Sequence, residues 1–139
     1  MNQHAPSPRG MHRLWSAGFS LIELMIVVAV IAVIAAIGYP SYVNSVVKTK
    51  RAAAAACVAQ YAAAMERYYT VNLRYDQDPG GNKNGLVGKP PPEPLDCSSA
   101  QNSGADYDFS VDATNDTFTA TANPKGAQLS RDTACGALS

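Results

Sequence analysis

The strongest constraint on this chain is an apolar run that begins at Leu24. No charged side chain occurs between Leu24 and Val47, and the first two-thirds of the run is almost wholly aliphatic. At a rise of 1.5 Å per residue, a helix of this length can cross a hydrocarbon core of about 30 Å. One carboxylate, Glu23, directly precedes the run. An unpaired charge near the bilayer centre costs roughly 2.5–3.5 kcal/mol, so we expect Glu23 to have a cationic partner.

The residues around this carboxylate form a motif at positions 18–28 with the sequence GFSLIELMIVV. It resembles the cleavage and methylation site of type IV prepilins, in which a membrane peptidase cuts after the glycine and methylates the new amino terminus. The resemblance implies cleavage between Gly18 and Phe19, an N-methylated Phe19, and a role for Glu23 in assembly. In an apolar bundle Glu23 can neutralise the amine of Phe19 on its own or a neighbouring chain. The alternative is that Glu23 reaches the headgroups near a helix end.

Residues 1–18 precede this motif and fit a leader that stays in the cytoplasm. They are polar, contain two prolines and carry Arg9 and Arg13, so they cannot build a core. Either Met1 or Met11 is the true start, and Met11 gives the shorter leader. A conventional secretory signal that ends in the small residues at 35–38 is a competing interpretation, but a carboxylate at the head of its apolar region argues against it.

Charge and histidine content restrict the chemistry of the mature chain. The whole chain has eleven basic and eleven acidic residues, and loss of Arg9 and Arg13 leaves a net charge of −2. We therefore do not expect direct DNA binding. Both histidines, His4 and His12, precede the cut, which removes histidine-based catalysis and the commonest zinc ligand. We expect no enzyme activity, no catalytic residues, no cofactor and no metal.

The helix that begins in the apolar run is predicted to continue well beyond it, from about Ser20 to Tyr69. Gly38 and Pro40 predict a kink or local unwinding, because proline lacks an amide proton and its ring clashes with the preceding turn. Beyond them apolar residues recur at helical spacing: Val43, Val47, Ala54, Val58, Tyr61, Met65 and Tyr68. A domain this small cannot cover the whole helix. Its first half must be buried by lipid or by other copies of the chain.

The remaining residues predict a loop followed by a small sheet. Residues 76–104 are rich in Gly, Pro, Asn and Ser and show no periodicity. Residues 107–111 and 118–122 alternate apolar and polar side chains, with a hairpin turn at 113–116, which predicts two antiparallel strands that cover the helix. Residues 123–126 predict a turn, and 133–139 a last strand or sheet edge. The three aspartates Asp106, Asp108 and Asp112 fall on the solvent face, which favours a plain polar surface over a calcium site.

Three cysteines allow one internal disulfide and leave one thiol. Cys57 lies on the sheet-facing side of the predicted helix and Cys97 follows the loop, so we favour a Cys57–Cys97 bridge. The alternative is Cys57–Cys135, because the family often places a bridge near its carboxyl end.

The resemblance extends beyond the motif to most of the mature chain and is closest to PilE-like minor pilins. It implies an α+β type IV pilin fold, with one long N-terminal helix packed on a small antiparallel sheet. We divide the chain into a leader (1–18), a transmembrane or filament-core helix (19–47), an amphipathic helix (48–72) and a globular part (73–139). Whether the carboxyl end is complete is left open.

The expected function is that of a structural subunit, a minor pilin of a type IV pilus that supports pilus assembly, twitching motility, adhesion or DNA uptake. Its expected partners are other pilin subunits, the prepilin peptidase, the inner-membrane assembly machinery and, before assembly, membrane lipid. The chain would cross the inner membrane once, with its amino terminus in the cytoplasm and its globular part in the periplasm, and then enter the extracellular pilus. The alternatives are a pseudopilin of a type II secretion system and a membrane-anchored binding module that never polymerises.

Overall fold

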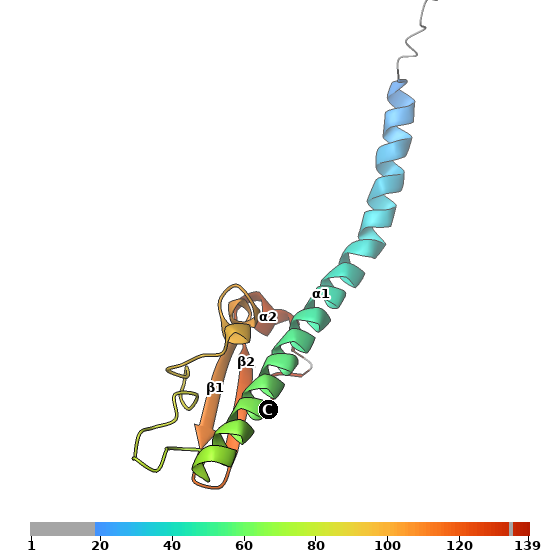
Figure 1. Cartoon of the computed structure of the whole chain (residues 1–139). Coiled ribbons are helices and arrows are strands. Elements are labelled where there is room, and N and C mark those ends of the chain that lie inside the picture. Colours follow the sequence, from blue (N-terminus) through green and yellow to red (C-terminus); the bar gives the residue numbers. More distant parts are fainter. Residues whose placement is uncertain (1–18, 134) are drawn as a thin grey trace, which may run out of the picture. The chain divides into compact units, whose positions relative to one another are not determined.

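A computed structural model describes residues 19–133 and 135–139 of the chain, so the predicted cleavage residue Gly18 lies outside the described residues. The elements follow in the order α1 (Leu21–Asn72), two short 3-10 turns (Asp96–Ser98 and Ser103–Ala105), β1 (Tyr107–Ala113), β2 (Phe118–Pro124) and α2 (Gly126–Arg131). The chain divides into two units, at Gly38 and Tyr39. The second unit, 39–139, holds both strands and the core (Figure 1).

α1 is unbroken from Leu21 to Asn72, as the apolar and alanine-rich sequence predicts. It continues through Gly38 and Pro40, so this structure shows no local unwinding there, whereas the kink expected as the other possibility stays a prediction. A proline removes only one hydrogen bond of the helical ladder, and the flanking residues keep the helical backbone. The helix ends where Leu73 adopts a left-handed backbone with φ of 55°, and the Leu73 amide still donates to the Tyr69 carbonyl at 2.8 Å.

β1 and β2 form a two-stranded antiparallel sheet alongside the C-terminal half of α1 (Figure 1). The register pairs Tyr107 with Pro124 and Ala113 with Phe118. Between the strands Thr114 and Thr117 close the turn, with the Thr114 amide donating to the Thr117 carbonyl at 2.8 Å. The predicted alternation is confirmed, because the apolar side chains of β1 are buried and the aspartates between them face solvent.

The core lies between this sheet and one stripe of α1. The buried helix residues are Ala54, Cys57, Tyr61 and Met65, which recur every three or four positions. The predicted stripe was correct in its centre, whereas its other members, Val43, Val47, Val58 and Tyr68, are half-buried. The sheet contributes Tyr107, Phe109, Val111, Ala120 and Ala122.

The segment after β2 differs from the prediction. Residues 126–131 form the short helix α2, for which a turn signal at 123–126 gave no indication. The expected last strand is reduced to a single bridge, in which Leu138 exchanges two backbone hydrogen bonds with Ala122 at 2.8 and 2.9 Å. The long loop after α1 is also attached to the sheet at one point, where Gly88 pairs with Val111.

Candidate assembly surface and the disulfide-anchored loop

The N-terminal half of α1 carries the most exposed apolar surface of the described residues. The most apolar stretch of this half contains no buried residue. Phe19, Leu21 and Ile22 are 78%, 76% and 64% exposed, and Ile37 is 74% exposed. Such a surface in water is costly, at roughly 25 cal/mol for each Å² of apolar area. This half of the helix therefore requires lipid or other protein around it, and its length and composition suit a membrane span.

Glu23 is the one acidic residue in the first turn of α1, and the exposed side chains around it are aliphatic. Its amide donates to the Ser20 carbonyl at 3.0 Å, so Glu23 and Phe19 lie about one helical turn apart along the chain. Once lipid or protein covers this apolar surface, the Glu23 carboxylate loses its contact with water. An amine at Phe19 is the nearest cationic group that the sequence could supply.

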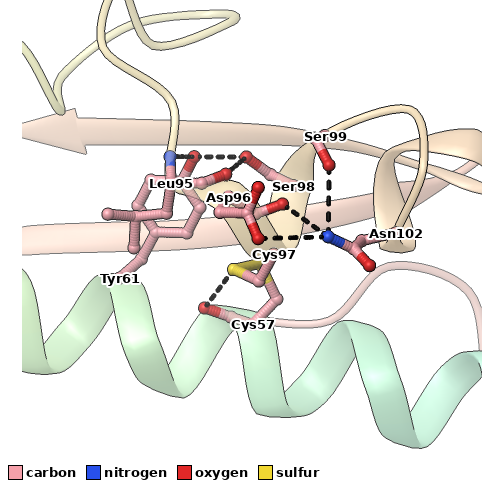
Figure 2. The surroundings of a disulfide bond; sticks show 8 residues. All are labelled: Cys57, Tyr61, Leu95, Asp96, Cys97, Ser98, Ser99 and Asn102. Atoms are coloured by element: carbon pink, nitrogen blue, oxygen red, sulfur yellow. Dashed lines mark hydrogen bonds between the residues drawn. A yellow bond between two sulfur atoms is a disulfide. The ribbon is translucent and has the colours of Figure 1, made fainter.

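A disulfide joins Cys57 of α1 to Cys97 of the long loop (Figure 2). The Cα atoms are 5.6 Å apart, and the two residues are 40 positions apart in sequence. Cys57 is fully buried in the core, whereas Cys97 packs at its edge. The third cysteine, Cys135, is exposed and free, so the alternative Cys57–Cys135 pairing is not the one formed.

Hydrogen bonds reinforce this attachment (Figure 2). The Tyr61 hydroxyl lies 2.8 Å from Ser98 Oγ and accepts a hydrogen bond from the Leu95 amide at 3.1 Å. Ser98 Oγ also lies 2.7 Å from the Leu95 carbonyl, to which it donates. The loop is thus fixed to α1 at the bridge and one helical turn further on, at Tyr61, although its sequence suggests a flexible segment.

A second polar cluster attaches α2 to α1. Arg51 Nη1 donates to Asp132 Oδ2 at 2.8 Å, and the Tyr107 hydroxyl donates to the same oxygen at 3.2 Å. Gln128 is buried and donates from Nε2 to the Tyr107 hydroxyl at 2.9 Å and to the Val47 carbonyl at 3.2 Å. The hydrogen bond that Arg51 donates to Asp132 is the main cause that raises the pKa of Arg51 above its usual value. These groups were not predicted, because residues this far apart in sequence give no local signal.

Most cations of the described globular part are neutralised by nearby aspartates. The pairs are Lys50–Asp106, Arg51–Asp132, Arg74–Asp76, Lys89–Asp112 and Lys125–Asp108, at 2.6–3.0 Å. The aspartates around β1 therefore face lysines. No group of three or more metal-ligating side chains was found in the described part of the chain. Lys48, Arg67, Lys83 and Arg131 have no such partner among the described residues.

A long N-terminal helix with an exposed apolar half, followed by a small antiparallel sheet packed on its second half, defines the type IV pilin class of proteins. Comparison with family models supports this class at both ends of the chain. Residues 16–39 match the prokaryotic N-terminal methylation motif. Residues 40–139 match the model described as "Type IV minor pilin ComP, DNA uptake sequence receptor".

The chain belongs to this type IV minor pilin family, because the match covers the whole second unit and more than half of the chain. No curated protein and no solved structure matches it. The predicted α+β pilin fold and the predicted minor-pilin function are confirmed. Pilins are structural subunits, and the methylation motif with the apolar helix identifies a membrane-anchoring segment of a pilus protein.

Proposed function

We propose that this minor pilin is cut between Gly18 and Phe19 and enters a type IV pilus through the apolar half of α1. Before assembly the chain crosses the inner membrane once, with its amino terminus in the cytoplasm and residues 48–139 in the periplasm. The prepilin peptidase and the inner-membrane assembly machinery then act on it in turn. Assembly exchanges lipid contacts of residues 19–47 for contacts with the same segment of neighbouring subunits.

One observation carries this proposal, which is that the large apolar side chains from Phe19 to Ile37 are exposed while Glu23 lies among them. A plain membrane anchor has no use for a carboxylate in this position, because an unpaired charge within the apolar layer is costly, by roughly 2.5–3.5 kcal/mol at the bilayer centre. A subunit that joins a helical bundle can pair Glu23 with the amine of a neighbour's Phe19. Pairing stabilises only the subunits that are in the correct axial register.

The test is the incorporation of a Glu23→Val variant into filaments. The variant is expected in membranes at the wild-type level but strongly depleted from sheared surface filaments. Asp116→Asn, which removes an exposed carboxylate from the hairpin turn, is the matched control and should assemble normally. Filaments that contain Glu23→Val at the wild-type level would contradict the assembly role and favour a different use of the span.

For the role of the pilus, we propose DNA uptake, since the family description names a DNA uptake sequence receptor. Direct contact with DNA by this subunit is a second candidate function. The charges argue against extensive contact, because five cations are already paired with aspartates. Arg67, near the end of α1, and Lys83, in the loop that follows it, are cations without a carboxylate partner among the described residues.

Binding of a short DNA duplex by the mature chain in detergent tests this second candidate. If Arg67 and Lys83 each contact a phosphate, the logarithm of the affinity falls with the logarithm of salt concentration with a slope of about −0.9 per contact. Arg67→Gln and Lys83→Gln should then each reduce the slope by about one contact. Absence of binding at low salt would assign DNA contact to another subunit and leave only the assembly role here.

A further inference from the structure

The end of the apolar run carries side chains that suit the surface of a membrane. Tyr39 and Tyr42 lie on α1 and are 68% and 70% exposed. Lys48 follows one residue after the run ends at Val47 and is also exposed. Tyrosine is enriched where membrane proteins pass from hydrocarbon to water, and lysine there meets lipid phosphates. Residues 39–48 therefore mark the level at which α1 leaves the hydrocarbon core.

Hydrogen bonds hold α2 next to the end of this segment of α1. Gln128 Nε2 donates to the carbonyl of Val47 at 3.2 Å, and Asp132, directly after α2, accepts from Arg51 at 2.8 Å. Gln128 is buried, and it also donates to the Tyr107 hydroxyl at 2.9 Å. Figure 1 shows α2 beside α1, near the end at which the helix enters the globular unit. The position of α2 is thus fixed from both of its ends.

α2 exposes an apolar and a cationic side chain that its attachment to α1 does not explain. Leu129 follows the buried Gln128 and is 58% exposed. Arg131 is exposed and has no carboxylate partner among the described residues, although most cations of the globular part have one. An exposed leucine and a free arginine on one short helix would both gain contacts at a lipid surface, the leucine below the phosphates and the arginine among them.

We propose that these five residues form a headgroup collar (Tyr39, Tyr42, Lys48, Leu129 and Arg131) that docks the globular part onto an anionic phospholipid surface while the subunit is anchored in the membrane. The proposal rests on the membrane-anchored state described under the proposed function. Anionic lipid is favoured over other anionic partners because the collar directly follows the apolar span. In the anchored state this span lies in the same membrane. Docking fixes the height of the globular part above the bilayer until assembly extracts the subunit.

An environment-sensitive fluorophore next to the collar tests the proposal. The mature chain, residues 19–139, carries Cys135→Ser to remove the free thiol and Ser130→Cys for the label. It is reconstituted in vesicles of phosphatidylcholine, with or without phosphatidylglycerol. With phosphatidylglycerol the label should shift to shorter emission wavelengths and be quenched by a headgroup-attached quencher. The same label at Asp116→Cys, in the hairpin turn, should report water in both vesicles.

Charge variants then assign the effect to the collar. Lys48→Gln and Arg131→Gln should each lower the ratio of docked to undocked label about fivefold, the effect of one cation near an anionic surface. Leu129→Ser should lower this ratio as well. Lys83→Gln removes a free cation from the loop after α1 and is the matched control, with no change expected.

The outcomes separate the collar from the proposed function. If the chain floats with the vesicles and resists alkaline extraction, but the label at position 130 reports water in both lipids, the collar proposal is wrong while the anchored state stands. If the chain does not insert at all, the proposed function fails and the collar with it. If DNA duplex rather than lipid shifts the label, the collar binds nucleic acid and lipid docking is rejected.

Discussion

At the scale of single residues, Tyr61 connects α1 to the loop through one buried hydroxyl. The side chain is 1% exposed, its ring stacks on Phe109 with centroids 6.0 Å apart, and its hydroxyl contacts both Ser98 and the Leu95 amide. Helical spacing predicted the burial of Tyr61. The partners of its hydroxyl could not be predicted, because they come from a loop whose path depends on the rest of the fold.

Tyr61→Phe should therefore destabilise the globular part by about 1–3 kcal/mol, the cost of leaving a buried polar group without its partner. The proposed mature chain, which begins at Phe19, lacks tryptophan, since Trp15 precedes the proposed cut, so denaturant unfolding is followed by near-ultraviolet circular dichroism of tyrosine. Tyr68→Phe is the control, because the Tyr68 hydroxyl makes no hydrogen bond with the described residues. Equal stability of the two variants would contradict the role of the Tyr61 hydroxyl.

A second prediction at this scale concerns acid. Hydrogen bonds from Arg74 to Asp76, both 3.0 Å long, are the main cause that lowers the pKa of Asp76 below its usual value. A depressed pKa means that the folded state favours the charged carboxylate. This stabilisation is present above the unfolded pKa of about 3.9 and is lost as pH falls through the folded value.

Stability of the wild-type chain should thus decline more steeply below about pH 4 than that of Asp76→Asn. Part of the decline should remain in the variant, because hydrogen bonds from Asn82 also lower the pKa of Asp78. Urea unfolding at a series of pH values measures the difference. Parallel pH profiles for the two proteins would mean that the Arg74–Asp76 pair is not linked to folding.

At the scale of elements, the long loop is attached to the rest of the fold although it has almost no regular structure. The Cys57–Cys97 disulfide, the Tyr61 hydroxyl and the Gly88–Val111 bridge attach it at three places. The sequence predicted the loop and favoured this disulfide. It gave no signal for α2, because six residues with a glycine at the start are too few for a helical period to be recognised.

Removal of the disulfide by Cys57→Ala with Cys97→Ala should lower the free energy of unfolding by about 2–4 kcal/mol, since the bridge closes a long loop in the unfolded chain. Cys135→Ser, which removes the exposed thiol, should change it by no more than about 0.5 kcal/mol. Both are measured by denaturant unfolding in detergent. A large effect of Cys135→Ser would indicate that Cys135 contributes to a disulfide in the protein as isolated.

At the scale of the whole molecule, the chain combines a globular unit with its own core and an apolar helix half that the described residues leave exposed. The globular unit needs only its own residues, Ala54 to Leu138, to build its core. The helix half needs partners, which we propose are first lipid and then other subunits. Burial of the apolar surface away from water can thus favour assembly only after the subunit leaves the membrane, because lipid covers this surface until then.

Intact mass spectrometry of sheared filaments and of membranes from the same cells tests the proposed processing and assembly. The filament species should begin at Phe19, carry one added methyl group, and be two hydrogen atoms lighter than the fully reduced chain because of the single disulfide. Reduction should restore those two hydrogens. An uncleaved chain confined to the membrane would contradict processing and assembly together.

The sequence by itself determined the long helix, the apolar half, the two strands and the position of the cleavage motif. These features arise from local composition and periodicity, which a chain carries whatever its tertiary structure. The tertiary structure alone decided that Arg51 pairs with Asp132, that Gln128 contacts Val47, and that α2 therefore lies beside this part of α1. Such contacts join residues about 80 positions apart, and their energy depends on the distances that packing sets.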